Sequence, residues 1–197
     1  MFERRLRKAR WQKAVQTLAN DPLFAEAEVE SLLDLSEQEW EPAAEHFYSR
    51  LSSGHKIVLL TITRLVELVD ERTLVLLDEP EGHLHPPLLS ACMRALADLL
   101  IHRNGVAIIA THSPVVLQEV PKSCVSILRR SGSRSACGRP EIETFGENVG
   151  ILTREVFGFE VTTSGFHNLL RQAVDQHQNY EAAIAHFNDQ VGAEGRE

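Results

Sequence analysis

Two adjacent carboxylates follow a short apolar run near the middle of this sequence. The run from Leu74 to Leu77 leads directly into Asp78, Glu79 and Pro80. A run of this length without polar residues predicts a β-strand that is buried on both faces, as in a parallel sheet. The carboxyl end of such a strand lies at the sheet edge where open α/β proteins bind ligands. One acid at this edge can hold Mg²⁺ through water, and the next can polarise an attacking water.

A histidine follows the next apolar run in the same way. The run Val106 to Ala110 predicts a second buried strand, and it is followed by Thr111 and His112. We therefore expect His112 at the same sheet edge as the two carboxylates. Its ring can donate a hydrogen bond to a phosphate oxygen or position a water there. A single histidine at a strand end is more often structural, so this interpretation depends on the neighbouring acids.

A helix start rich in small residues lies upstream of the acids. Ser52, Ser53, Gly54 and His55 precede an apolar pattern with helical spacing. Ser52 or Ser53 is the expected N-cap, and Gly54 would let a ligand approach the backbone closely. The amides and hydroxyls of such a helix start can bind an anion. For these residues alone, a capped helix without a ligand is the simpler explanation.

Taken together, the three motifs resemble the signature motif, the Walker B motif and the switch histidine of the ABC-type ATPase superfamily. Their order and spacing agree with that family. Ser53 and His55 replace the glycine and glutamine of transporter-type signatures. With the Glu-Pro-Glu-Gly-His-Leu-His-Pro run at 79–86 and Thr-His-Ser-Pro at 111–114, they look most like the OLD-like and Septu-type defence ATPases.

This resemblance implies a fold and a set of roles. The fold would be α/β: a partial ABC-type, P-loop NTPase-like parallel sheet flanked by helices. Two such domains would face each other head to tail around ATP and Mg²⁺. Asp78 would hold Mg²⁺ through water, Glu79 would polarise the attacking water, and His112 would contact the γ-phosphate. The signature residues 52–55 would bind the nucleotide held by the facing domain.

The phosphate-binding loop of such an enzyme is missing from the sequence. No G-x-x-x-x-G-K-[ST] motif is present: only Lys122 precedes a Ser or Thr, and Pro121 stands where glycine is required. We interpret the chain as the carboxyl-terminal part of an ATPase domain, which hydrolyses ATP only when a missing amino-terminal part or a partner supplies the P-loop. One alternative is a non-catalytic regulatory or dimerisation module that binds an intact ATPase. A decayed gene product without an independent fold is the third reading.

The composition is that of a soluble globular protein. Of 197 residues, 43% are hydrophobic and 24% are charged, which suffices for one domain with a real core. The formal net charge of −8 argues against nucleic-acid binding through bulk charge. Three cysteines without C-x-x-C spacing indicate reduced thiols in a cytoplasmic protein. No apolar run approaches the length of a transmembrane helix, so no membrane association is expected.

We expect three parts along the chain. These are a helical arm at 1–46, the portion with the signature, Walker B and switch histidine at 47–145, and a helical carboxyl-terminal extension at 146–197. The arm is basic at first and acidic beyond about residue 20, so its two segments could pair as a helical hairpin. The basic segment is either a patch that faces DNA or a protein partner, or the exposed end of the arm, and we favour the latter. We expect an exposed loop at 129–139 and a last strand at 140–145.

The resemblance also implies partners. They are an ATPase domain in a homodimer or heterodimer, a separately encoded HNH-type nuclease, and DNA, in a role in phage defence or DNA repair. His83 and His85 follow the Walker B motif, in the loop that would cross the dimer interface. An H-x-H pair can bind a metal, but without a third ligand we prefer a packing or interface role.

Overall fold

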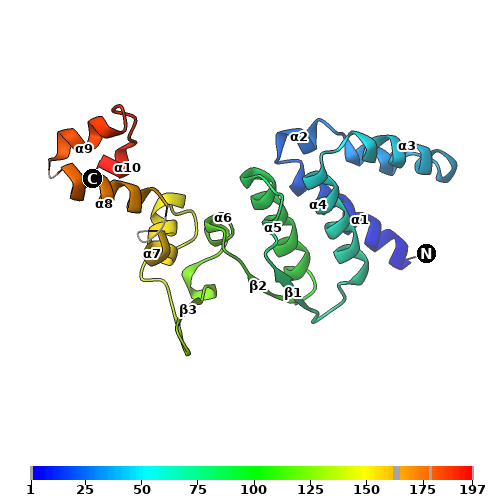
Figure 1. Cartoon of the computed structure of the whole chain (residues 1–197). Coiled ribbons are helices and arrows are strands. Elements are labelled where there is room, and N and C mark those ends of the chain that lie inside the picture. Colours follow the sequence, from blue (N-terminus) through cyan, green and yellow to red (C-terminus); the bar gives the residue numbers. More distant parts are fainter. Residues whose placement is uncertain (1, 162–164, 178, 197) are drawn as a thin grey trace. The chain divides into compact units, whose positions relative to one another are not determined.

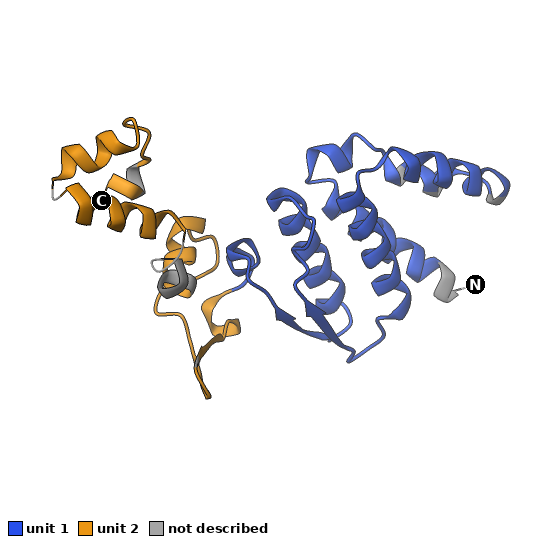
Figure 2. Ribbon diagram, viewed as in Figure 1, with its two compact units in different colours: residues 1–120 blue, residues 121–197 orange. Residues whose placement is uncertain are grey.

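The computed structural model describes residues 2–161, 165–177 and 179–196 of the chain. It divides into two compact units, residues 1–120 and residues 121–197 (Figure 2). The boundaries expected after residues 46 and 145 do not coincide with this division. The basic and acidic segments of the arm lie in the same unit as both apolar strands.

In its described residues, the first unit packs its helices against one face of a single pair of strands (Figure 1). In chain order its elements are α1 (Phe2–Leu18), α2 (Pro22–Ala25), the 3-10 helix η1 (Val29–Asp34), α3 (Glu37–Arg50), α4 (Ser53–Leu68), β1 (Leu74–Asp78), α5 (Pro86–Ile101), β2 (Val106–Ala110) and α6 (Pro114–Gln118). The strands are parallel, with Leu74 opposite Val106 and Asp78 opposite Ala110. Helix α5 makes the long connection that a parallel pair requires. The mixed α/β class predicted from the sequence, a small parallel sheet flanked by helices, is confirmed.

The core of this unit lies where α1, α4 and α5 pack together. Each helix contributes an apolar stripe with helical spacing; in α4 it includes Val58, Ile62 and Val66, all buried. The stripe of α1 ends in Val15 and Leu18, which are also fully buried. Helix α1 therefore makes its main contacts with α5 and α4. A helical hairpin with the acidic segment, which the sequence suggested, is therefore not the main packing arrangement of α1.

The two faces of the β1–β2 sheet differ. On one face, apolar side chains pack against the helical core: Val75, Leu77, Ala107 and Ile109. Because side chains alternate along a strand, the intervening residues lie on the opposite face. There, four apolar side chains are 56–69% exposed: Leu74, Leu76, Val106 and Ile108. The strand expected to be buried on both faces is thus covered on one face only.

Among its described residues, the second unit holds a β-hairpin, one 3-10 helix and four α-helices. Its elements are the 3-10 helix η2 (Lys122–Cys124), β3 (Ile127–Ser131), β4 (Arg134–Gly138), α7 (Val149–Val161), α8 (Phe166–His177), α9 (Tyr180–His186) and α10 (Ala193–Arg196). Strands β3 and β4 pair antiparallel, so the loop expected at 129–139 is instead largely β-structure. Helices α7 to α10 occupy the described part of the expected helical extension.

No strand forms at 140–145, where one was expected. The carboxylate of Glu143 accepts hydrogen bonds from the backbone N–H groups of Lys122, Thr144 and Phe145, at 2.7, 2.9 and 3.3 Å. These three bonds, that from Lys122 first, hold the pKa of Glu143 below its ordinary value. They give the segment a bent conformation that cannot join a strand ladder. None of the helices in the described part of the chain is both long enough and apolar enough to cross a membrane.

Candidate functional site

The carboxyl ends of β1 and β2 bring the predicted acids and His112 to one edge. Glu79 continues the pairing beyond β1, because its N–H donates to the carbonyl of Ala110 at 2.8 Å. Glu79 Oε1 then lies 3.7 Å from His112 Nε2. The side chains of Glu79 and His112 are 65% and 75% exposed, and Asp78 is exposed as well. These three side chains are therefore open to a ligand.

Glu81 ties the two strand ends together. Its Oε1 accepts hydrogen bonds from Thr111 Oγ1 at 2.8 Å and from the N–H of His112 at 2.7 Å. Its Oε2 is buried and has no hydrogen-bond partner among the described residues. A buried carboxylate oxygen without a partner is rare, and it marks a place where a further ligand could bind. Glu81 was not among the site residues predicted from the sequence, although an acid two residues after Glu79 was a usable signal.

The loop after β1 contains unusual backbone. Glu79 has φ 46° and His83 has φ 66°, both in the left-handed region that favours glycine. Such residues cost about 1–3 kcal/mol each and persist only where the surroundings hold them. Here the bond from Glu79 to Ala110 and the two bonds to Glu81 hold the loop. Backbone strain of this kind concentrates at functional sites, which agrees with the exposed acids beside it.

A second cluster forms around Asp21, which is fully buried. Asp21 caps α2 by accepting from the N–H of Phe24 at 2.9 Å. Its Oδ1 lies 3.0 Å from His55 Nε2, and its Oδ2 lies 2.7 Å from His85 Nε2. Burial alone would raise the pKa of Asp21, but the hydrogen bonds from His55, Phe24 and His85 together outweigh burial and lower it. Asp21 is thus an anion that joins the start of α4 to the loop after β1.

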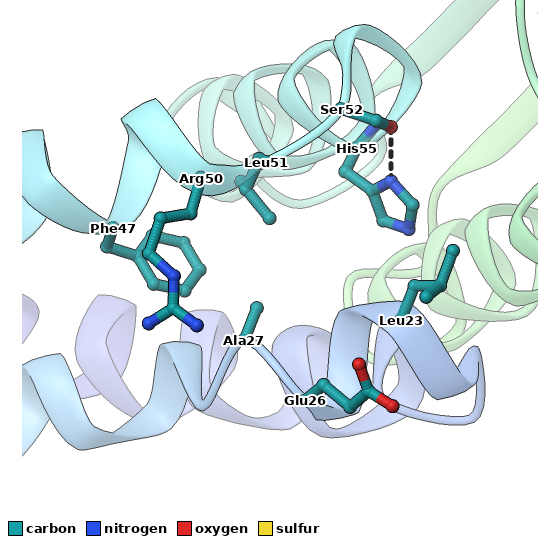
Figure 3. Close-up of a pocket in the computed structure, with 8 residues that line it drawn as sticks. All are labelled: Leu23, Glu26, Ala27, Phe47, Arg50, Leu51, Ser52 and His55. Atoms are coloured by element: carbon teal, nitrogen blue, oxygen red, sulfur yellow. Dashed lines mark hydrogen bonds between the residues drawn. The ribbon is translucent and has the colours of Figure 1, made fainter.

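His55 links Asp21 to Ser52. A carboxylate only accepts hydrogen bonds, so His55 Nε2 carries a proton. The other ring nitrogen, Nδ1, is hydrogen-bonded to the Ser52 hydroxyl, 2.5 Å away (Figure 3). Ser52 is also the N-cap of α4. Because His55 is 3% exposed and uses both ring nitrogens, it holds Ser52 in place and is not free to contact a nucleotide. Ser52 and Ser53 themselves are exposed.

Gly54 has a packing role. A Cβ at this buried position would lie 2.9 Å from the carbonyl oxygen of His83 and 3.4 Å from the side chain of Leu84. Glycine therefore lets the first turn of α4 pack against the loop after β1. The close approach of a ligand, predicted from the sequence, is not needed to explain a glycine here.

A cavity of about 230 Å³ opens beside Ser52 and His55 (Figure 3). Its other lining residues come from the region of α2 and from the end of α3: Leu23, Glu26, Ala27, Phe47, Arg50 and Leu51. This volume is below the range of about 300–1,000 Å³ that is usual for small-molecule sites. None of Asp78, Glu79 and His112 lines it, so the cavity is separate from the carboxylate edge.

His85 has the packing role preferred from the sequence, since its Nε2 bonds to buried Asp21. His83 is exposed. Within the described ranges, no group of three His, Cys, Asp or Glu residues is arranged to hold a metal ion.

Two comparisons place the chain among known proteins. A family model described as AAA domain, putative AbiEii toxin, Type IV TA system, matches residues 10–118. The chain is also 53% identical over 203 residues to protein ea59 of Escherichia phage lambda. That match covers 94% of this chain and 39% of ea59, so the chain spans about two fifths of its relative. The range matched by the family model contains both clusters, from Asp21 to His112.

Proposed function

Because the chain belongs to the AAA-domain family described as putative AbiEii toxin, Type IV TA system, we propose that it supplies the acidic and histidine side of an ATP-hydrolysing site. The observation that carries this proposal is the approach of Glu79 to His112, at 3.7 Å, from neighbouring parallel strands. Both lie at the carboxyl edge of the sheet, where α/β proteins bind ligands.

The residues at this edge suit Mg²⁺ and ATP. Asp78 and Glu79 offer exposed carboxylate oxygens, which Mg²⁺ prefers and can bind through water. Bound Mg²⁺–ATP would supply the phosphoryl group and neutralise its charge. In this proposal Asp78 holds the ion through water, Glu79 accepts a hydrogen bond from the attacking water and orients it, and His112 donates a hydrogen bond to the γ-phosphate.

The phosphate-binding loop comes from another segment or polypeptide. The sequence has no P-loop, and the sheet face formed by Leu74, Leu76, Val106 and Ile108 is apolar and exposed. Parallel sheets are normally covered on both faces. We propose that the part carrying the P-loop covers this face and thereby brings its loop to the carboxyl edge. The length of ea59 beyond the matched 39% is compatible with such a part.

The start of α4 serves a second, facing site in this proposal. Ser52 and Ser53 lie exposed at the helix N-terminus and offer hydroxyls and backbone amides to the nucleotide of a facing ATPase domain. His55 keeps Ser52 at that position. The resemblance to the OLD-like and Septu-type branch is the support for a role in phage defence or DNA repair, and for an HNH-type nuclease as a partner.

ATP hydrolysis by a chimera tests the proposal. In the chimera, this chain replaces the matched segment of ea59. Glu79→Gln is expected to lower turnover at least about 100-fold while ATP is still bound, because only the orientation of water is lost. Glu71→Gln, an exposed acid near the opposite end of β1, is the matched control and should leave turnover unchanged. Equal turnover with Glu79 and with glutamine at this position would reject the proposal.

A non-catalytic module that binds and regulates an intact ATPase is the second candidate. The internal use of both ring nitrogens of His55, together with the missing P-loop, favours it. This function depends on the exposed sheet face and not on the acids. It therefore predicts that Leu76→Glu abolishes the effect on the partner ATPase, whereas Glu79→Gln leaves it intact.

A further inference from the structure

The β3–β4 hairpin carries a concentration of positive charge that the proposed ATPase site does not use. Segment 122–140 contains one lysine and four arginines and no acidic residue, in a chain with a net charge of −8. In the hairpin, Arg129, Arg130 and Arg134 lie opposite neutral residues, so no carboxylate on the facing strand compensates their charge.

The four arginines are exposed and lack carboxylate partners. Arg129, Arg130 and Arg139 donate to backbone carbonyl oxygens, at 3.5, 3.1 and 2.6 Å respectively. Arg134 is fully on the surface of β4. No ion pair among the described residues includes any of the four. Carbonyl oxygens do not neutralise a guanidinium, so the charge of the hairpin is available to an external anion.

The hairpin has the shape of an isolated two-stranded ribbon. Ser131 pairs with Arg134, which leaves a two-residue turn that begins at Gly132 with φ 60°. Because cross-strand neighbours share a face, Arg129 and Arg134 lie on one face of the ribbon and Arg130 on the other. Every residue of β4 is exposed. The ribbon extends away from the helices of its own unit (Figure 2).

We propose that this hairpin binds the phosphate backbone of B-form duplex DNA without sequence preference. Guanidinium groups match phosphate oxygens in two-point contacts. A two-stranded ribbon fits the major groove of B-form DNA, which is about 12 Å wide, and arginines on both of its faces reach the phosphates on either side.

The other anionic surfaces fit less well. The major groove of A-form RNA is deep and narrow and excludes a ribbon. Single strands are held by stacking on aromatic side chains, and segment 122–140 contains none. Helix α1, the other basic segment, is held in the core: Arg10 bonds to the carbonyl of Val69, and Lys13 to His102. The hairpin is thus a better candidate for binding DNA than helix α1.

Fluorescence anisotropy of a labelled duplex of about 20 base pairs, titrated with the full chain at several salt concentrations and without nucleotide, tests this proposal. Three phosphate contacts predict a slope of log affinity against log salt of about −2.7. The triple variant Arg129→Ala/Arg130→Ala/Arg134→Ala is expected to lose at least about tenfold in affinity and to bring the slope close to zero. Circular dichroism confirms that both proteins are folded.

Two further triple variants separate a specific hairpin site from bulk charge. Arg5→Ala/Arg7→Ala/Lys8→Ala removes the same charge from α1 and should leave the affinity within about twofold of the parent. Lysine at 129, 130 and 134 should retain the salt slope but weaken binding, because two-point contacts are lost. Equal loss in the two alanine triples would overturn the proposal, as would no binding by the parent. Tighter binding to single strands or to phosphatidylserine vesicles than to the duplex would also overturn it. None of these outcomes depends on ATP hydrolysis.

Discussion

Two histidine–carboxylate clusters in the first unit are built in opposite ways. Asp21 is fully buried and bonds to His55 and His85 at 3.0 and 2.7 Å. Glu79 and His112 are mostly exposed and lie 3.7 Å apart. A buried charge must have its partners in place, and removal of one leaves the others unsatisfied. An exposed pair gains little from its contact and keeps its capacity for a ligand. The first cluster therefore holds the fold, and the second is the one suited to chemistry.

The largest expected effect is that of Asp21→Ala. It leaves three buried or half-buried donors without an acceptor, on His55, His85 and Phe24. We expect the free energy of unfolding to fall by about 3 kcal/mol. In a chain of this size that lowers the melting temperature by about 9 °C, measured by circular dichroism. Asp21→Asn keeps one acceptor oxygen and should lose less. A loss below about 0.5 kcal/mol for Asp21→Ala would mean that the buried cluster does not hold the fold.

Gly54→Ala comes next, because it forces apart the two segments that the buried cluster connects. The added Cβ would meet the carbonyl oxygen of His83 at 2.9 Å, and a backbone atom cannot move aside as a side chain does. We expect about 2 kcal/mol of destabilisation in urea unfolding. Gly82→Ala is the matched control, since its Cβ would meet the nearest atom at an ordinary 3.5 Å. Equal effects at the two glycines would contradict tight packing between α4 and the loop after β1.

Lowering the pH should also reduce the stability that the buried cluster contributes, by less than the two substitutions above. The pKa of Asp21 is lowered in the folded chain, so its ionised form contributes stability that is fully present above the ordinary carboxyl pKa of 3.8. This contribution is lost as the pH falls through the lower pKa of the folded state. The stability difference between the parent and Asp21→Asn, followed by urea unfolding from pH 6 downward, should therefore shrink in that range. A difference that stays constant there would show that Asp21 is not the titrating group.

The smallest expected effects on stability belong to the exposed pair. Glu79→Gln and His112→Ala should each change the free energy of unfolding by less than about 0.5 kcal/mol, because both side chains are mainly in solvent. The same Glu79→Gln change is the one expected to stop turnover in the chimera. A loss of stability comparable to that of Asp21→Ala would remove the distinction between the two clusters.

The features that the sequence predicts correctly are those with a local signature. The apolar runs before Asp78 and His112 become β1 and β2, and parallel pairing then brings their ends together. Ser52 caps α4 as expected. In each case a few neighbouring residues determine the local structure. The position of the candidate site then follows from the rule that open α/β sheets bind ligands at the carboxyl ends of their strands.

The features that the sequence does not predict depend on contacts between residues far apart in the sequence, or on which surfaces are covered in the fold. Asp21 belongs to no motif, and only folding brings it to His55 and His85. Most of the hairpin, residues 129–138, was expected to be a loop because arginine, serine and glycine dominate it and apolar alternation is lacking. The exposure of Leu76 could not be foreseen either, since an apolar strand indicates burial without saying which chain provides the cover.

The left-handed backbone at Glu79 has a consequence for laboratory evolution. Glycine adopts φ 46° without steric cost, so a library sorted only for folded protein would accumulate glycine there, with a gain of up to about 1 kcal/mol. A library sorted for the activity of the assembled protein would retain glutamate at the same position. The two libraries would therefore differ at residue 79, and this difference could be seen without knowing which reaction the protein catalyses. A stabilised variant of this chain is therefore in danger of losing the carboxylate that we propose orients the attacking water.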